Sequence, residues 1–203
     1  MSKSTRAILG SLVAVATGLG SYGCTPDWAT QDNSPVTLFI VSVNGAVPLA
    51  SDVWDEATTT VRADVVTLAL ANRAKNQTVP VPNIPSALFV ERYEVKYVRS
   101  DGRGVEGVDV PFAISGAVTF GFDVADSGTV ELPLEVVRAQ AKLESPLRNL
   151  RNTPNSLSAD PDPFGGGAQV LTVFADITLH ARTPAGQVTT ATGRFQIDFA
   201  DYQ

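Results

Sequence analysis

Hydrophobic and polar residues alternate along most of the chain after residue 35, with the two-residue period of strands that are buried on one face. The period predicts strands at residues 36–43, within 58–70, and at 88–99, 112–124, 129–132, 170–182 and 187–199. A bulge is expected at Gly116, because an isolated glycine inside a strand often marks one. Strands therefore dominate this chain.

The strongest element is a C-terminal hairpin. Residues 173, 175, 177, 179 and 181 are all apolar and form one face of its first strand, and polar residues occupy the other face. Residues 183–186 (TPAG) form the turn between the two strands. A similar alternation places Tyr93, Val95 and Tyr97 toward a core.

One segment departs from the strand pattern. Residues 133–144 begin with a proline, continue with good helix formers and are followed by Pro146, which predicts a short helix or helical crossover. About seven strands with long connections and one short helix predict an all-β fold, an antiparallel β-sandwich of immunoglobulin or fibronectin type. The sandwich is expected to occupy residues 36–203.

The first 23 residues have the layout of a secretory signal. Lys3 and Arg6 precede an apolar run at residues 7–20, and small residues then lead to Cys24. The run is too short and too rich in glycine to remain in a bilayer as a helix. Residues 24–35 are polar and contain prolines, which predicts a flexible tether.

Residues 19–24 (LGSYGC) resemble the lipobox of bacterial lipoproteins, in which small residues precede a cysteine that becomes acylated and N-terminal. Gly23 and Cys24 match the last two positions, whereas Ser21 stands where the family has leucine. The resemblance implies that Cys24 attaches the chain to a lipid bilayer. In the sorting pattern of enteric bacteria, an aspartate after the cysteine keeps a lipoprotein out of the outer membrane. This chain has Thr25 at that position, so the resemblance implies the outer membrane.

Two longer segments also look like those of uncharacterised bacterial lipoproteins that end in such a hairpin. They are YEVKYVRSDGRGVEGVDVPF and ITLHARTPAGQVTTATGRFQIDFADY. This resemblance supports the fold and the location, and it implies no activity.

Charge and composition narrow the functional classes. The leader holds two of the 15 basic residues and no acid, so the remaining chain has 13 bases against 21 acids and a net charge of −8. A nucleic-acid partner would need a basic surface, so it is not expected. One His, one Met and one Cys leave few ligands for zinc, copper or haem, and no cofactor is expected.

The candidate binding residues are few. Asp160 and Asp162 in one loop, and Asp101 and Asp109 around a glycine-rich turn, could supply oxygens to calcium, but a solvated turn is favoured because EF-hand spacing is missing. Trp28 and Trp54 are weak candidates for contact with a sugar or peptide.

Catalysis is not expected. His180, the one imidazole, lies on the polar face of a strand, and no Gly-x-Ser-x-Gly elbow occurs. A carboxylate pair could still hydrolyse glycosides, with Glu91, Glu94, Asp109, Asp123, Asp176 and Asp198 available.

These observations favour a membrane-anchored, non-catalytic sandwich that binds a partner or joins an envelope or surface assembly. The partner would be an envelope or surface protein or a polysaccharide, on the periplasmic or outer side of the outer membrane. A carbohydrate-active hydrolase and a calcium-stabilised adhesin-like module stay open as alternatives.

Overall fold

The computed structural model describes residues 34–55, 57–75, 87–123, 128–151 and 170–202. Within these ranges the chain forms eight strands and three short 3₁₀ helices. The strands are β1 (Val36–Val43), β2 (Leu49–Asp52), β3 (Asp64–Ala74), β4 (Leu88–Arg99), β5 (Ile114–Phe122), β6 (Val130–Val137), β7 (Leu171–Arg182) and β8 (Val188–Ala200). The helices are η1 (Asn44–Ala46), η2 (Ala139–Leu143) and η3 (Leu147–Leu150).

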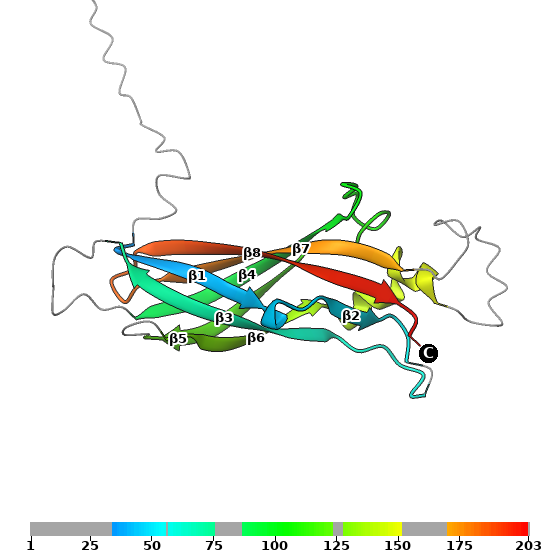
Figure 1. The fold of residues 1–203 in the computed structure, drawn as a ribbon, viewed down its shortest axis with the longest axis horizontal. Coiled ribbons are helices and arrows are strands. Elements are labelled where there is room, and N and C mark those ends of the chain that lie inside the picture. Colours follow the sequence, from blue (N-terminus) through cyan, green and yellow to red (C-terminus); the bar gives the residue numbers. More distant parts are fainter. Residues whose placement is uncertain (1–33, 56, 76–86, 124–127, 152–169, 203) are drawn as a thin grey trace, which may run out of the picture.

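The strands form two sheets, in the orders β1-β3-β6 and β2-β8-β7-β4-β5 (Figure 1). This is an immunoglobulin-type strand order. In immunoglobulin lettering, the first sheet is A-B-E (β1, β3, β6), and the second contains G-F-C-C′ (β8, β7, β4, β5). The predicted all-β sandwich is therefore confirmed. One pairing differs from the prediction, because β2 runs parallel to β8. With only four residues, β2 shows too little alternation to be recognised in the sequence.

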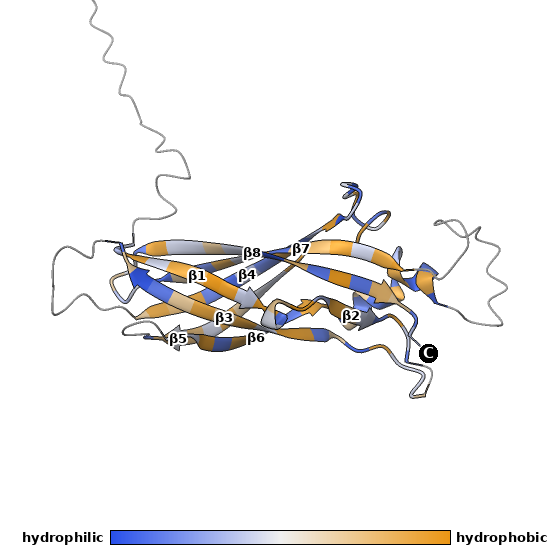
Figure 2. Cartoon of the chain, viewed as in Figure 1, coloured by the Kyte–Doolittle hydropathy of each residue, from blue (hydrophilic) through white to orange (hydrophobic). Residues whose placement is uncertain are grey.

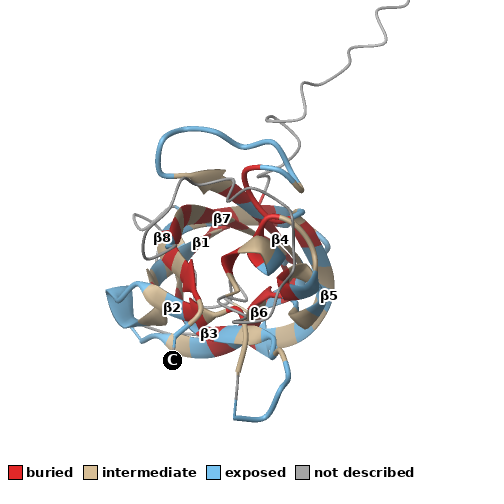
Figure 3. Ribbon diagram, turned by 90° about the vertical axis from the view of Figure 1, so that its right-hand side faces the viewer, coloured by how far each residue is buried: buried red, intermediate tan, exposed pale blue. Residues whose placement is uncertain are grey.

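The core lies between the sheets, where buried residues line the inner surface of the strands (Figure 3). The inward row of β7 is buried at every position, as its alternation predicts. Val95 and Tyr97 are also buried, and Tyr93 is partly buried against the same core. The hairpin and the inward side of β4 are thus confirmed.

The register shifts lie near Gly116 but not at it. Against β7, Glu91 is an extra residue of β4, and against β5 the extra residue is in β5, between Ala117 and Phe120. Gly116 itself pairs regularly with Tyr93. A Cβ at position 116 would overlap the Tyr93 ring, so the glycine makes room for an aromatic side chain. Because of the bulge, Glu91 and Arg92 are both exposed.

The predicted helix begins later than expected. Its first residues extend β6, in which Leu132, Leu134 and Val136 are buried at a two-residue period. Pro133 is tolerated because β6 is an edge strand, where a missing N–H need not break a ladder. The helical part is only the 3₁₀ helix η2.

The turn between β7 and β8 is the one predicted. Gly186 donates its N–H to the carbonyl of Thr183, and Thr183 donates to the carbonyl of Gln187. The positive φ of Gly186, 83°, fits the left-handed position of a three-residue hairpin loop.

The helix η1 stores backbone strain. Asn44, Gly45 and Ala46 have φ values of 51°, 62° and 63°, in the left-handed region that a side chain with a Cβ disfavours. The Asn44 side chain donates a hydrogen bond to the carbonyl of Val47 and so supports this conformation. Ala46 has no such side-chain bond to offset its strain.

Replacing Ala46 with glycine should therefore stabilise the protein by about 0.5–1 kcal/mol, because relief of left-handed strain outweighs the added chain entropy. Urea unfolding followed by circular dichroism measures the change. Ala50→Gly, in β2 and without a positive φ, is the matched control and should lose about 0.5–1 kcal/mol. Equal losses in both variants would contradict the strain.

Candidate functional site

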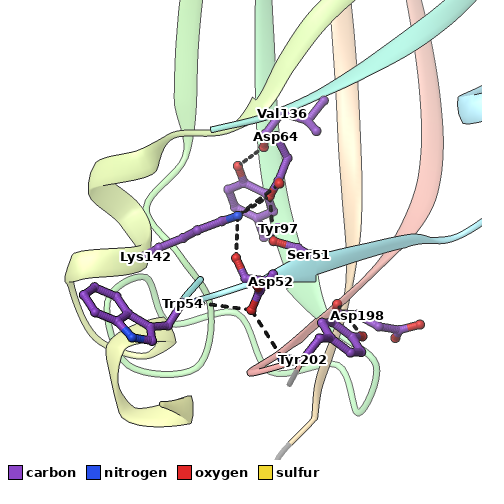
Figure 4. Close-up of polar contacts among 9 residues, drawn as sticks. All are labelled: Ser51, Asp52, Trp54, Asp64, Tyr97, Val136, Lys142, Asp198 and Tyr202. Atoms are coloured by element: carbon purple, nitrogen blue, oxygen red, sulfur yellow. Dashed lines mark hydrogen bonds and ion pairs between the residues drawn. The ribbon is translucent and has the colours of Figure 1, made fainter. Parts of the chain in front are cut away.

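A buried ion pair holds together one end of the sandwich (Figure 4). Lys142, on η2, is only 1% exposed. Its Nζ lies 3.0 and 2.9 Å from the two carboxylate oxygens of Asp64, at the start of β3. It also donates a 2.7 Å hydrogen bond to the backbone carbonyl of Asp52, in β2. A single ammonium group thus joins η2 to two elements that precede it by 78 and 90 residues.

Two further hydrogen bonds complete this polar cluster. The hydroxyl of Ser51 donates a 2.6 Å bond to Asp64, so the carboxylate has two donors. The hydroxyl of Tyr97, on β4, donates to the backbone carbonyl of Val136, on β6, and so links the two sheets. Burial raises the pKa of Tyr97 well above its usual value of 10.0, so its hydroxyl remains a donor. The cluster is largely buried, with 2% of the Lys142 side chain and 17% of the Asp64 side chain exposed.

Trp54 lies at the edge of this cluster. The guanidinium of Arg151 stacks 4.4 Å from the centre of its ring, and Arg151 also donates a 3.0 Å hydrogen bond to the carbonyl of Lys142. The carboxylate of Asp52 accepts the backbone N–H groups of Trp54 and Tyr202. One face of the indole is therefore occupied by a cation, which leaves less of Trp54 for a ligand than the sequence suggested.

The same end of the molecule exposes apolar side chains. We call it the far end, because it lies opposite the start of β1 (Figure 1). Val105, Val108 and Phe112, in the β4–β5 connection, are 59%, 63% and 52% exposed. Leu143 on η2 is also exposed. Large exposed apolar residues in loops often mark contact sites.

A shallow groove of about 290 Å³ runs through this far end. The β4–β5 connection forms one wall, from Pro111 to Ile114, and the η2 region forms the other. Its charged groups are Arg138, which donates a 2.9 Å hydrogen bond to the carbonyl of Ser115, and Glu144, which accepts one from Gln140. The groove thus combines an apolar wall with a mostly polar wall that carries one cation and one anion, a mixture suited to binding a protein segment.

The glycine-rich turn holds an arginine between its two acids. Arg103 bonds to Asp101 at 2.8 and 2.9 Å and lies 3.6 Å from Asp109. The hydrogen bond from Arg103 lowers the pKa of Asp101 below its usual value. The guanidinium thus lies between the two carboxylates that were considered as calcium ligands. Among the described residues, no group of three or more His, Cys, Asp or Glu side chains could hold a metal.

His180 lies on the outer face of the five-stranded sheet. Its Nε2 is 3.3 Å from the guanidinium of Arg92 and 3.6 Å from the carboxylate of Glu94. Burial and the Arg92 charge lower its pKa below 6.5, and Glu94 acts in the opposite direction. The histidine is therefore mostly neutral at pH 7 and belongs to a surface charge network.

Three of the carboxylates considered for hydrolysis are engaged by neighbours in the same sheet. Glu91 pairs with Arg182, and Asp176 pairs with Arg194 at 2.6 and 2.8 Å. Asp198 accepts hydrogen bonds from Thr172 and Gln196. Each of these acids therefore takes part in hydrogen bonds or ion pairs on the outer surface of the strands.

Several predicted residues lie outside the described part of the chain. They are Cys24, Trp28, Asp160 and Asp162. No helix within the described ranges is long and apolar enough to cross a membrane.

The sequence analysis missed Lys142, Asp64 and Phe112. Lys142 falls in the segment predicted as a short helix or helical crossover, and nothing in its sequence neighbourhood indicates that it is buried. Asp64 could have been noticed, because an acid directly precedes the apolar row of β3.

No protein-family model, curated protein or solved structure matches the chain. Its own residues and their geometry therefore carry the functional argument.

Replacing Lys142 with methionine should destabilise the protein by about 3–5 kcal/mol, because Asp64 would keep a buried charge without its partner. Chemical unfolding of the two proteins measures the difference. Lys96→Met, on an exposed position of β4, should change stability by no more than about 0.5 kcal/mol. Adding Asp64→Asn to Lys142→Met should recover part of the loss, and a further loss would contradict the proposed pair.

Proposed function

We propose that this chain is an exported lipoprotein whose sandwich is anchored through Cys24 and binds a partner without catalysing a reaction. The observation that carries the proposal is the separation of the two ends. The chain enters the sandwich at the start of β1, and the far end, with its groove and exposed apolar loop, is at the opposite side (Figure 1).

The arrangement supports display of a contact surface. An anchor before β1 would leave the far end directed away from the bilayer. There Lys142 and Asp64 hold η2 against β2 and β3, so one wall of the groove rests on a buried, fixed base. A rigid wall reduces the entropy lost when a partner binds.

The chemistry of the far end favours a protein partner. Phe112 and Leu143 offer apolar contact area, and Arg138 and Glu144 offer one charge of each sign. Such a surface resembles the mixed centre and rim of protein interfaces more than a nucleic-acid site.

The anchor is tested by replacing Cys24 with serine. The native chain, expressed in a bacterial host, should fractionate with membranes and carry diacylglycerol on its N-terminal cysteine by mass spectrometry. Two or more acyl chains bind far more firmly than one, so the variant should move almost entirely to the soluble fraction. An unmodified thiol in the native protein would refute the anchor.

The partner is tested by photo-cross-linking in intact cells. A photoreactive amino acid at Val108 or Phe112 should give an adduct of one discrete mass. The same amino acid at Phe89, which is 42% exposed on the outer face of β4, is the control and should not. Failure at both far-end positions, with the protein present at its native level, would refute the proposed contact surface.

A further inference from the structure

The Lys142 amine and the Asp64 carboxyl group lie at a distance that suits a reaction between them (Figure 4). The Nζ atom of Lys142 is 3.0 Å from Oδ1 and 2.9 Å from Oδ2 of Asp64. The carboxyl carbon lies between these two oxygens, so it is within about 3.5 Å of Nζ, the separation of a near-attack arrangement.

The surroundings of the pair hold each atom in place. Apolar residues recur along the strands of both sheets (Figure 2), and Lys142 is the only buried basic side chain among the described residues. The buried hydroxyl of Ser51 donates a 2.6 Å hydrogen bond to Oδ2 of Asp64. Nζ donates a 2.7 Å bond to the carbonyl of Asp52 and a 3.0 Å bond to Oδ1. The two carboxylate oxygens are thus distinguished, since Ser51 holds Oδ2 and the amine itself holds Oδ1.

We propose that Lys142 and Asp64 condense, after the sandwich has folded, into an amide bond between their side chains. One proton of the ammonium group first moves to Oδ1, which leaves a neutral amine and a neutral acid. A largely buried site favours this step, because separated charges are costly there. The lone pair of Nζ then forms a bond to the carboxyl carbon. The Ser51 hydroxyl stabilises the negative charge that develops on Oδ2.

The remaining atoms leave as one molecule of water. Oδ1 takes a second proton from Nζ, and its bond to the carboxyl carbon breaks. The charged pair thus becomes an amide and water, with no oxidant, cofactor or other reactant. The amide keeps one N–H for the carbonyl of Asp52, and its oxygen, Oδ2, keeps the hydrogen bond from Ser51. The 17% exposure of the Asp64 side chain gives the water a path out.

Confinement favours the amide over the separate groups. Free amines and acids form little amide in water, but two groups held in contact react as though each were present at about 10⁵–10⁸ M. The fold supplies this confinement, because Ser51 and Asp52, in β2, hold the reacting groups of β3 and η2 together.

A covalent link suits an exported domain that has a single cysteine. Cross-links persist outside the cell, but one cysteine cannot form a disulfide within its own chain. The amide spans 78 positions of the sequence. Like a disulfide, it stabilises the fold by limiting the conformations of the unfolded chain. It also fixes η2, which forms one wall of the far-end groove, and it depends neither on Cys24 nor on a partner.

Mass spectrometry of the full chain carrying Cys24→Ser, folded, incubated and then denatured, tests the bond. The chain should be lighter than its sequence requires by one water, about 18 Da. Trypsin should release residues 63–73 and 139–148 as one branched peptide, uncut after Lys142. Cleavage after Lys96, which is exposed, is the internal control and should be complete.

Two variants locate the chemistry. Lys142→Arg keeps the positive charge but removes the nucleophilic amine, so it should retain its full mass. Ser51→Ala should form the bond about tenfold or more slowly, because the developing charge on Oδ2 loses its donor. An unchanged rate would contradict the role of Ser51.

A Cys24→Ser chain that keeps its full mass after prolonged incubation in the folded state would overturn the proposal. Loss of water without the branched peptide would also overturn it, because a cyclic imide at Asp64 loses the same mass without joining the two segments. Neither result would bear on lipid attachment or on the far-end contact surface.

Discussion

The buried pair of Lys142 and Asp64 determines how this sandwich is closed. Its three hydrogen-bonded contacts join η2, the start of β3 and the end of β2, and the Ser51 hydroxyl provides a fourth bond. A buried charge that lost its partner would cost several kcal/mol, so these elements must come together as a unit. The short strand β2 and the 3₁₀ turn η2, which have little intrinsic stability, depend on that constraint.

Closure of this end has consequences for both edges of the sandwich. It seats β2 on β8 as a parallel edge strand and holds β6 and η2 beside β5. Arg138 then donates to the carbonyl of Ser115, which covers part of the open edge of β5 with a side chain from the other sheet. Covered or proline-containing edges resist uncontrolled strand pairing. Interactions of this domain are therefore expected through faces and loops rather than through its edges.

The proposed contact surface at the far end follows from this architecture, because it includes η2, which the buried pair holds against β2 and β3. The outer face of the five-stranded sheet differs from it, since cross-strand ion pairs keep that face hydrated.

The sequence alone determined the elements in which alternation and turn chemistry agree. The C-terminal hairpin, the bounds of β1 and β4, and the inward rows of β4 and β7 follow from local periodicity, because each strand carries its own buried face. Tertiary structure decided the rest. Pro133 became a strand residue because β6 lies at an edge, and Gly116 pairs regularly because the Tyr93 ring needs its space. Lys142 is buried only because residues 90 and 78 positions away supply a carbonyl and a carboxylate. No local pattern encodes such a long-range contact.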